Sequence, residues 1–406
     1  AFQHTRYWVE GTGALGDLSA AGLAAAGHPL LGAVVSLADS GGVVLTGRVS
    51  VSAQPWLADH LVGDSVVFPG TGFVELAVRA GDQVGCDSLE ELMLQSPLVL
   101  PERGAVALQV EVGAADAAGR RPVSVHSRRD DQPDQPWTLH AAGVLAAGAA
   151  TATATAAVAT AGAAADAFGL AAWPPAGSAP IDTAGVYEAL AAAGLPYGPA
   201  FRGLTAAWRA GTEVFAEVAL PEGGHADAAA FGLHPALLDA SLHGSVFTDL
   251  FAGAEGPVLP FVWTGVWLHA SGATRLRVRI TPDGSGALAL SVGDETGRPV
   301  LSVDSLVLRE VSAQQLAAAR TVAHESLFAL DWAALPAGHA PGAAPADWDA
   351  LPADAPVPEA VVLHCAPARD ADGVRAATGR VLAAQQSWLA DERYPATRQV
   401  IATRGA

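Results

Sequence analysis

The chain repeats one pattern twice: a series of short, alternating apolar runs interrupted by a single helical segment. In the first half, His28–Val144, the runs are Val-rich and separated by Gly and Pro, as in Val43–Val51, Val106–Val112 and Pro122–His126. Such alternation predicts half-buried strands. Among them, Thr71–Ala80 carries apolar residues at spacings of three and four behind a Pro-Gly break, which predicts one helix.

The second half contains the same kinds of element. Two of its segments, Thr183–Ala193 and Pro235–His243, are predicted to be helices. The alternating runs that predict its strands are Thr212–Ala219, Val262–His269, Arg275–Ile280, Ala287–Val292 and Val300–Arg309. A parallel sheet would require a regular alternation of strands with long helices, which is not found. We therefore expect an α+β fold in which antiparallel sheets surround a central helix twice.

Residues 146–165 divide the two halves. They are almost wholly Ala, Thr and Gly, whose side chains are too small to build a core, so we expect a linker there. After Val311, an Ala/Pro-rich connector leads to strand-like, helical and strand-like segments, the opening βαβ order of an α/β unit. The expected divisions of the chain are 1–27, 28–145, 146–177, 178–311 and 312–406.

The composition limits the classes of function. With 406 residues, 51% of them hydrophobic, the chain can build more than one core. A formal net charge of −19 argues against nucleic acid or an anionic membrane surface as the main partner, because both attract clustered cations. Cys86 and Cys365 match no disulfide or zinc pattern, and no segment reads as a secretory signal or membrane helix. We expect a cytoplasmic protein.

A histidine in an apolar setting is the first candidate for chemistry. His60 is followed by two apolar residues, a loop with Gly63, an apolar strand and the turn at Pro69 and Gly70. Burial at the edge of a cleft would lower the pKa of the imidazole and keep it neutral, as a general base must be. The alternative is a core histidine that hydrogen-bonds a backbone carbonyl.

The second candidate is a carboxyl group on a predicted helix. Within Pro235–His243, Asp239 and His243 lie on one face at a spacing of four, and the neighbours of Asp239 are Leu, Ala and Ser. Desolvation there would raise the pKa of the carboxyl and keep it protonated, as a general acid requires. The alternative is an Asp and a His that face water or each other. His234 and His243 lack the spacing of a helical metal-ligand pair, so we expect no metal site.

Together these segments resemble a known family. Further motifs follow in order along residues 28–311: His28–Gly32, Trp137–Gly143, Tyr197–Gly203 and Leu259–Trp263. The chain resembles the double-hotdog dehydratase domains of modular polyketide synthases and animal-type fatty acid synthases. Its flanks agree, because Phe2–Trp8 is similar to the linker after an acyltransferase domain and Ser326–Trp332 to the start of a ketoreductase structural subdomain.

The resemblance implies an enzyme that removes water from a 3-hydroxyacyl thioester on an acyl carrier protein. His60, from the first hotdog, would take the α-proton, and Asp239, from the second, would protonate the departing β-hydroxyl. The N–H groups at the start of the Thr71 helix would stabilise the charge that develops on the thioester oxygen. The residues with implied supporting or substrate-binding roles are Gly63, Pro69, Gly70, Tyr197, Gly198, Pro199 and His243.

The resemblance also implies partners. The phosphopantetheine arm of the carrier protein would bring the substrate, and the domain itself would bind no cofactor. Its neighbours in the polypeptide would be acyltransferase and ketoreductase domains, and the family implies a homodimer. Arg275, Arg277 and Arg279 alternate along one predicted strand and would suit docking of an acidic carrier protein, with a solvated outer face as the alternative.

Two points stay open at the level of sequence. The family has Gly four residues after the catalytic His, whereas this chain has Gly63 at the third position and Asp64 at the fourth. That carboxylate would either turn outward or stabilise protonated His60 and weaken it as a base. The same acid/base pair would also serve a double-bond isomerase or a cyclase that forms cyclic ethers, and a non-catalytic spacer is a further alternative.

Overall fold

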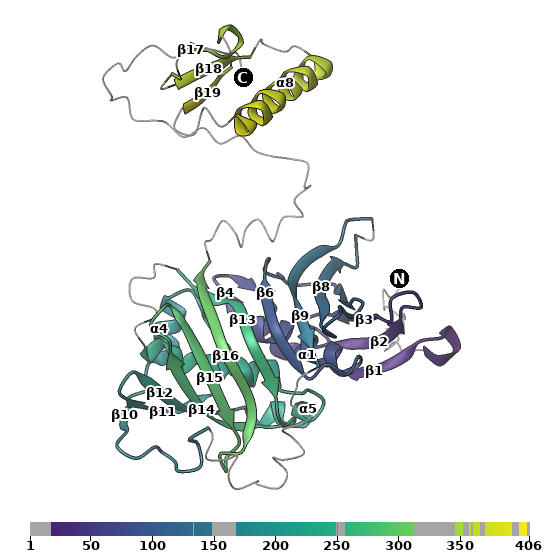
Figure 1. Ribbon diagram of the computed structural model, residues 1–406. Coiled ribbons are helices and arrows are strands. Elements are labelled where there is room, and N and C mark those ends of the chain that lie inside the picture. Colours follow the sequence, from purple (N-terminus) through teal and green to yellow (C-terminus); the bar gives the residue numbers. More distant parts are fainter. Residues whose placement is uncertain are drawn as a thin grey trace, which may run out of the picture. The chain divides into compact units, whose positions relative to one another are not determined.

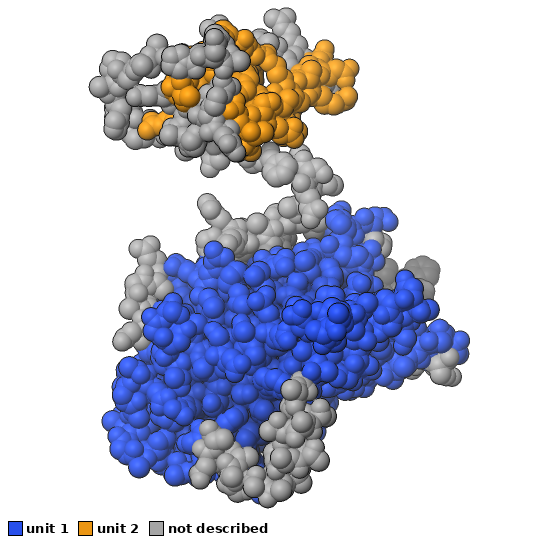
Figure 2. Space-filling view, in the orientation of Figure 1, with its two compact units in different colours: residues 1–327 blue, residues 328–406 orange. Residues whose placement is uncertain are grey.

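The computed structural model describes residues 18–132, 134–147, 168–248, 250, 256–311, 346–351, 357–358, 360–365, 370–391 and 398–403. The predicted segments Phe2–Trp8 and Ser326–Trp332 lie outside these residues, as does most of the predicted linker at 146–165. The chain forms two compact units, one within residues 1–327 and the other within 328–406 (Figure 2). In the described part of the chain, no helix has both the length and the apolar content of a membrane span.

The first unit is built on a continuous antiparallel sheet, in which the described residues contribute 14 strands (Figure 1). In spatial order, the strands of the first half are β1 (Ala24–His28), β2 (Leu31–Ser36), β3 (Val43–Val49), β7 (Val106–Val112), β8 (Arg121–Arg129), β9 (Thr138–Ala146) and β6 (Ser88–Leu94). Those of the second half are β13 (Val258–Leu268), β16 (Pro299–Glu310), β15 (Ala287–Gly293), β14 (Arg275–Pro282), β12 (Glu213–Ala219), β11 (Leu204–Ala210) and β10 (Ala179–Ile181). Because β6 pairs with β13, the two halves join edge to edge.

Alternation along the strands explains which face of the sheet is buried. In β7, Val106, Leu108, Val110 and Val112 are buried, whereas Glu111 between them is exposed. Successive side chains of a strand point to opposite faces, so one face of the strand packs into the core. The predicted range Val106–Val112 therefore agrees with the structure.

Each half of the sheet packs against one buried helix. In the first half this helix is α1 (Gly70–Asp82), which is buried along most of its length. Two glycines of α1 permit close contact with the segments that flank the helix. A Cβ at Gly72 would lie 2.6 Å from the Phe68 ring, and one at Gly81 would lie 2.8 Å from the Cys86 carbonyl oxygen. The predicted helix Thr71–Ala80 thus lies where α1 is found.

The second half surrounds α6 (Pro235–Leu242), all of whose residues are buried. Pro235 occupies the first helical position, where its missing N–H costs no intrahelical hydrogen bond. Helices α1 and α6 contact each other across the two halves, and the Thr71 hydroxyl donates a hydrogen bond to the Pro235 carbonyl at 2.9 Å. The other helical elements of this unit are η1 (Leu18–Ala21), η2 (Pro55–Asp59), α4 (Val186–Ala192), η4 (Pro199–Phe201), η5 (Glu222–Gly224), α5 (His225–Ala228) and η6 (His243–Phe247).

The second unit is smaller and parallel. Its strands β17 (Ala346–Asp347), β18 (Ala360–His364) and β19 (Arg398–Ala402) pair in that order, with η8 (Trp348–Ala350) after β17. Helix α8 (Ala371–Ala390) connects β18 to β19. This strand–helix–strand order confirms the predicted opening of an α/β unit after residue 311.

Candidate active site

The residues that follow His60 form a tight hairpin. β4 (Leu61–Val62) pairs with β5 (Ser65–Val66), which leaves Gly63 and Asp64 as a two-residue turn. Gly63 has φ +57° and no described non-glycine residue has positive φ, so the turn is of type II′, which takes Gly first. Asp64 is exposed at this turn and is not among the groups that shift the pKa of His60. The structure therefore favours the alternative in which this carboxylate does not stabilise protonated His60, although Asp64 also belongs to the lining of the cavity that contains His60.

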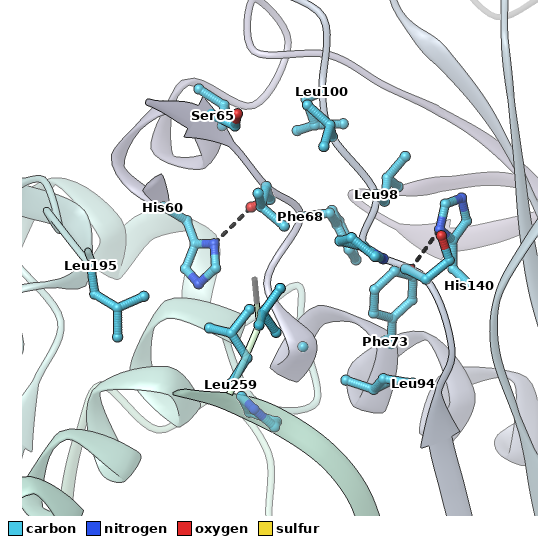
Figure 3. Close-up of a pocket in the computed structure, with 18 of the residues that line it drawn as sticks. His60, Ser65, Phe68, Phe73, Leu94, Leu98, Leu100, His140, Leu195 and Leu259 are labelled. Atoms are coloured by element: carbon cyan, nitrogen blue, oxygen red, sulfur yellow. Dashed lines mark hydrogen bonds between the residues drawn. The ribbon is translucent and has the colours of Figure 1, made fainter. Parts of the chain in front are cut away.

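His60 lies immediately before this hairpin with one nitrogen engaged and one free. Its Nδ1–H donates to the Val67 carbonyl at 2.7 Å, the dashed line drawn from His60 in Figure 3. Because a carbonyl only accepts, Nδ1 carries the proton and Nε2 keeps its lone pair. Burial lowers the pKa of His60 below its usual value of 6.5, and the carboxylate of Asp239 offsets this only in part. The imidazole is thus held neutral with Nε2 available as a base.

Asp239, on α6, faces the same nitrogen. Its Oδ1 lies 3.8 Å from His60 Nε2, and its Oδ2 accepts a hydrogen bond from His243 Nε2 at 3.2 Å. Burial raises the pKa of this carboxyl, but the hydrogen bonds from His243 and Tyr197 and the attraction of the His60 and His243 rings in their protonated forms outweigh burial and lower the pKa below its usual value. The prediction that desolvation keeps Asp239 protonated is therefore wrong for this site without substrate, because polar donors surround the carboxyl.

Tyr187 and His243 form a chain of hydrogen bonds behind Asp239. The Leu204 N–H donates to the Tyr187 hydroxyl at 2.8 Å, and the hydroxyl lies 3.3 Å from His243 Nδ1. Burial raises the pKa of Tyr187 to about 12, so the phenol keeps its proton and donates a hydrogen bond to His243 Nδ1. His243 then carries its own proton on Nε2, directed at the carboxylate. Tyr187 was absent from the sequence prediction, since no local spacing relates it to the helix 56 residues away.

We expect Tyr187→Phe to lower kcat for dehydration about 10-fold, because His243 then loses the donor that fixes its tautomer. Steady-state rates with a 3-hydroxyacyl thioester measure the effect, and KM should remain near that of the parent. The melting temperature should fall, because the Leu204 N–H also loses its acceptor. Thr205→Val is the control, since it removes a hydroxyl from the strand that carries Leu204, on the exposed side. Equal kcat values in Tyr187→Phe and the parent would contradict a positioning role for Tyr187.

The Tyr197–Pro199 loop holds the residue that precedes His60. The Gly198 N–H donates to the Asp59 carbonyl, and the Ala200 N–H to Asp59 Oδ2, each at 2.8 Å. A Cβ at Gly198 would lie 2.2 Å from Asp59 Oδ1, so only glycine fits. This loop of the second half thereby fixes the first-half segment that ends in the candidate base.

A cavity of about 1250 Å³ connects these groups. Both halves line it, with His60 and Phe68 from the first and Leu259 from the second (Figure 3). Asp239 of the second half also lines it. Of the predicted supporting residues, Gly70, Tyr197 and His243 also line the cavity. Those that do not are Gly63, Pro69, Gly198 and Pro199. These four shape the hairpin, the α1 cap and the Asp59 contact, which fits the supporting part of the prediction.

The start of α1 offers donors to the cavity. Pro69 is the N-cap, and its carbonyl accepts from the Gly72 N–H at 2.9 Å, so that N–H is engaged. The N–H groups of Gly70 and Thr71 precede it in the first turn, where no intrahelical acceptor is available. A Cβ at Gly70 would lie 3.0 Å from the Leu94 side chain. Glycine therefore lets the start of α1 lie close to Leu94 in the cavity wall.

The histidine at the other end of α6 has a structural role. His234 caps the helix by accepting from the Ala236 N–H, and its ring packs against Trp56 and Phe231. Burial lowers the pKa of His234 to about 4. Among the described residues, no group of His, Cys, Asp and Glu has the arrangement of a metal site.

The arginine stripe on β14 is engaged within the chain. Its three members are paired with Glu295 for Arg275, with the Leu170 carbonyl for Arg277 and with Glu213 for Arg279. Arg277 also lies over the Trp173 ring, with the guanidinium carbon 5.4 Å from its centroid. Each of the three side chains thus has a partner within the domain, Arg277 in the segment Leu170–Trp173 and the other two on glutamates, which favours the alternative of a solvated outer face.

Comparisons with known proteins identify this arrangement. Residues 28–128 match the polyketide synthase dehydratase domain, and residues 165–318 match the polyketide synthase dehydratase N-terminal domain. A solved dehydratase from work on the borrelidin and fluvirucin polyketide synthases is 51% identical, with a TM-score of 0.64, over 72% of this chain and 99% of that one. The chain belongs to the polyketide synthase dehydratase family.

Other relatives of this dehydratase agree. The dehydratase domain from the terminal module of the rifamycin polyketide synthase is 46% identical, with a TM-score of 0.64, over 72% of this chain and all of that one. Polyketide synthase GfsA of Streptomyces halstedii is 49% identical across the whole chain, which spans 6% of that protein. Across eight curated relatives, the chain spans between 6% and 19% of their lengths.

The family assignment confirms the predicted double-hotdog fold and dehydration within a modular polyketide synthase. The matched models are those of dehydratases, and so are the solved structures, one of which, 45% identical, is a bifunctional dehydratase-cyclase domain from ambruticin biosynthesis. The comparisons therefore support the hydro-lyase activity and favour none of the isomerase, cyclase and spacer alternatives. Residues 314–406 match the Rossmann fold domain of a polyketide synthase extender module. This match confirms the predicted ketoreductase-like start after the dehydratase.

Proposed function

We propose that this dehydratase removes water from a 3-hydroxyacyl thioester on an acyl carrier protein, with His60 as the base and Asp239 as the acid. The observation that carries the proposal is the approach of His60 Nε2 to Asp239 Oδ1, 3.8 Å, inside the cavity lined by both hotdogs. Two positioned proton-transfer groups are what an α,β-elimination of water needs, and each contributes about 10²- to 10⁴-fold in rate.

The reaction begins at the α-carbon of the thioester. Nε2 of His60 takes the α-proton, while the Nδ1–H bond to the Val67 carbonyl keeps the ring oriented. Electron density moves toward the thioester oxygen, where the N–H of Gly70, which lines the cavity at the start of α1, can donate to the developing charge.

Asp239 supplies the proton that the departing hydroxyl needs. In the free site its pKa is lowered, so the carboxylate gains its proton only after His60 has been protonated. Transfer from imidazolium to carboxylate converts an ion pair into two neutral groups, which changes no net charge in the buried site. The acid then protonates the hydroxyl as the C–O bond breaks and the Cα–Cβ double bond forms. The proton removed from carbon thus leaves with water.

The cavity has room for a substrate on a long carrier arm. Its volume of about 1250 Å³ exceeds the roughly 300–1,000 Å³ of ordinary small-molecule pockets. We infer that a phosphopantetheine arm brings the substrate, that acyltransferase and ketoreductase domains flank this one, and that the assembly is a homodimer. Light scattering of the purified chain tests the dimer.

We propose the same boundaries for the domains as the sequence predicts. Residues 1–27 are assigned to the linker that follows an acyltransferase, 28–145 and 178–311 to the hotdogs, 146–177 to the linker between them, and 312–406 to a linker and the ketoreductase start. The matched ranges 28–128, 165–318 and 314–406 support this division.

The direct test is turnover by the purified chain. The chain is incubated with each configuration of a 3-hydroxyacyl thioester on a carrier protein, and mass spectrometry follows the loss of one water from the acyl group. We expect dehydration of one configuration. If neither loses water, the proposed reaction is wrong. The alternatives are tested with a 2,3-enoyl thioester, with and without a hydroxyl farther along the chain, where a product of unchanged mass with a moved double bond or a ring would assign the chain to the isomerase or cyclase alternatives.

The acid limb of the pH–rate profile should lie below pH 6.5. As the pH falls, protonation of His60 removes the Nε2 lone pair and kcat/KM declines; burial lowers the pKa of His60, so the decline comes below its usual value. Initial rates with a pantetheine thioester between pH 4.5 and 8 measure this limb. A midpoint at or above pH 6.5 would show that His60 is not the titrating base.

A further inference from the structure

A second polar pair lies on the cavity wall and takes no part in the proposed reaction. Ser127 on β8 and His140 on β9 both line the cavity and are both buried. The Ser127 Oγ and His140 Nε2 atoms are 2.7 Å apart, and His140 Nδ1 lies 2.9 Å from the Ser96 carbonyl oxygen. The hydrogen-bonded pair places polar atoms in the cavity wall.

The direction of each hydrogen bond follows from its partners. The Ser96 carbonyl only accepts, so His140 Nδ1 carries the proton and Nε2 accepts from the Ser127 hydroxyl. Burial lowers the pKa of His140 to about 4, so the ring is neutral near pH 7. The Ser127 hydroxyl donates its hydrogen to His140, so Ser127 Oγ can still accept a hydrogen bond from a group in the cavity.

The surroundings of the pair are apolar. The Phe73 ring stacks on His140 with a centroid distance of 5.9 Å, and Phe68 packs edge-on against Phe73 at 5.0 Å. In Figure 3, Phe68 and Phe73 lie between His60 and His140, with Leu94 and Leu98 beside them. The pair therefore stands apart from the reacting groups, along an apolar stretch that an acyl chain would occupy.

We infer that Ser127 and His140 form a subsite for a hydroxyl group farther along the acyl chain, an inference that rests on the proposed function. A chain hydroxyl can donate to Ser127 Oγ while the Ser127–His140 bond stays intact. A keto group needs a donor, and Ser127 could supply one only by leaving His140 Nε2 buried and unpaired. The subsite thus selects a hydroxyl over a keto group or a methylene at that position.

The preference should be modest because the pair is self-satisfied. A substrate without the hydroxyl leaves neither Ser127 nor His140 without a partner, so nothing penalises its binding. What remains is the gain of one neutral hydrogen bond, which corresponds to a ratio of kcat/KM values of roughly 3- to 10-fold.

The test measures how fast the full-length protein dehydrates a series of pantetheine thioesters. The parent substrate is 3-hydroxyoctanoyl-pantetheine, and its analogues carry a second hydroxyl or a keto group at C5 or C7. We expect kcat/KM for one dihydroxy analogue to exceed that of the parent substrate by roughly 3- to 10-fold, with no gain for the keto analogues. Ser127→Ala should bring the ratio to one, whatever its rate with the parent substrate.

Two further variants make the result decisive. Ser124→Ala removes a hydroxyl from the same strand but outside the cavity lining, and should keep the preference. Ser127→Ala leaves His140 Nε2 unpaired, so Ser127→Ala/His140→Phe, which replaces both partners with apolar groups, guards against misfolding and should also lose the preference.

The proposal fails if the parent chain shows no preference for either dihydroxy analogue, or if the preference survives in both Ser127 variants. If 3-hydroxyoctanoyl-pantetheine and all its analogues remain unreacted, the proposed function falls and the subsite with it. A reacting parent substrate with equal rates for all analogues overturns the subsite alone.

Discussion

Replacing His60 with Ala should lower kcat for dehydration by about 10²- to 10⁴-fold, because the base that takes the α-proton is lost. The geometry gives the reason. Nδ1 is committed to the Val67 carbonyl, so Nε2, 3.8 Å from Asp239 Oδ1, is the nitrogen that can accept a proton in the cavity. Formation of the enoyl thioester, followed by mass spectrometry, measures the loss.

A matched variant separates this loss from a general effect of removing a histidine. His225 is exposed on α5 and bonds the Leu220 carbonyl, outside the cavity lining. We expect His225→Ala to keep the parent rate, and Asp239→Asn to lose activity as severely as His60→Ala. The double variant His60→Ala/Asp239→Asn should be little worse than either single variant, since the two groups act as a unit. An unchanged rate in His60→Ala would remove this residue from the mechanism.

Much of the fold could be predicted from side-chain alternation. The structure has the predicted Val-rich strand at β7 and the predicted strand–helix–strand order in the second unit. Two strands for which the sequence analysis named no range, β1 (Ala24–His28) and β11 (Leu204–Ala210), are rich in Ala and show little contrast in hydrophobicity between their faces. The pairing of β6 with β13 joins segments far apart in the chain, and periodicity within either segment carries no information about its partner.

The site divides in the same way between local and distant information. His60 and Asp239 were found from their motifs, because each has a recognisable local setting. The protonation state of Asp239 could not be predicted in this way, since two of the groups that lower its pKa, Tyr197 and His60, come from distant segments. Tyr187 was missed for the same reason, as its partners are a helix end and a strand start that only the fold brings together.

Glu75 connects the two hotdogs away from the reacting groups, and its loss should destabilise the double hotdog. It is 4% exposed on α1, and its Oε1 accepts from the Gly232 N–H at 2.7 Å and from His28 Nε2 at 3.2 Å. Its Oε2 accepts from the Leu233 N–H at 3.0 Å. One carboxylate thus satisfies two backbone donors in the segment that leads into α6.

We expect Glu75→Leu to lower the free energy of unfolding of this unit by about 3–5 kcal/mol, because a side chain of similar size leaves these buried donors unpaired. Denaturant unfolding followed by circular dichroism measures the change. Glu75→Gln should lose less, since its amide oxygen keeps one acceptor. The control is Glu111→Leu on β7, where the side chain is exposed and the change should stay within about 0.5 kcal/mol.

The two glutamate variants also distinguish stability from catalysis. Glu75 does not line the large cavity, so the folded fraction of Glu75→Leu should keep the parent KM while its midpoint of unfolding falls. If the unfolding free energy of Glu75→Leu equals that of the parent, the two hotdogs are held together without this carboxylate. The pairing of β6 with β13, the Asp59 contact and the contact between α1 and α6 would then suffice to keep His60 opposite Asp239.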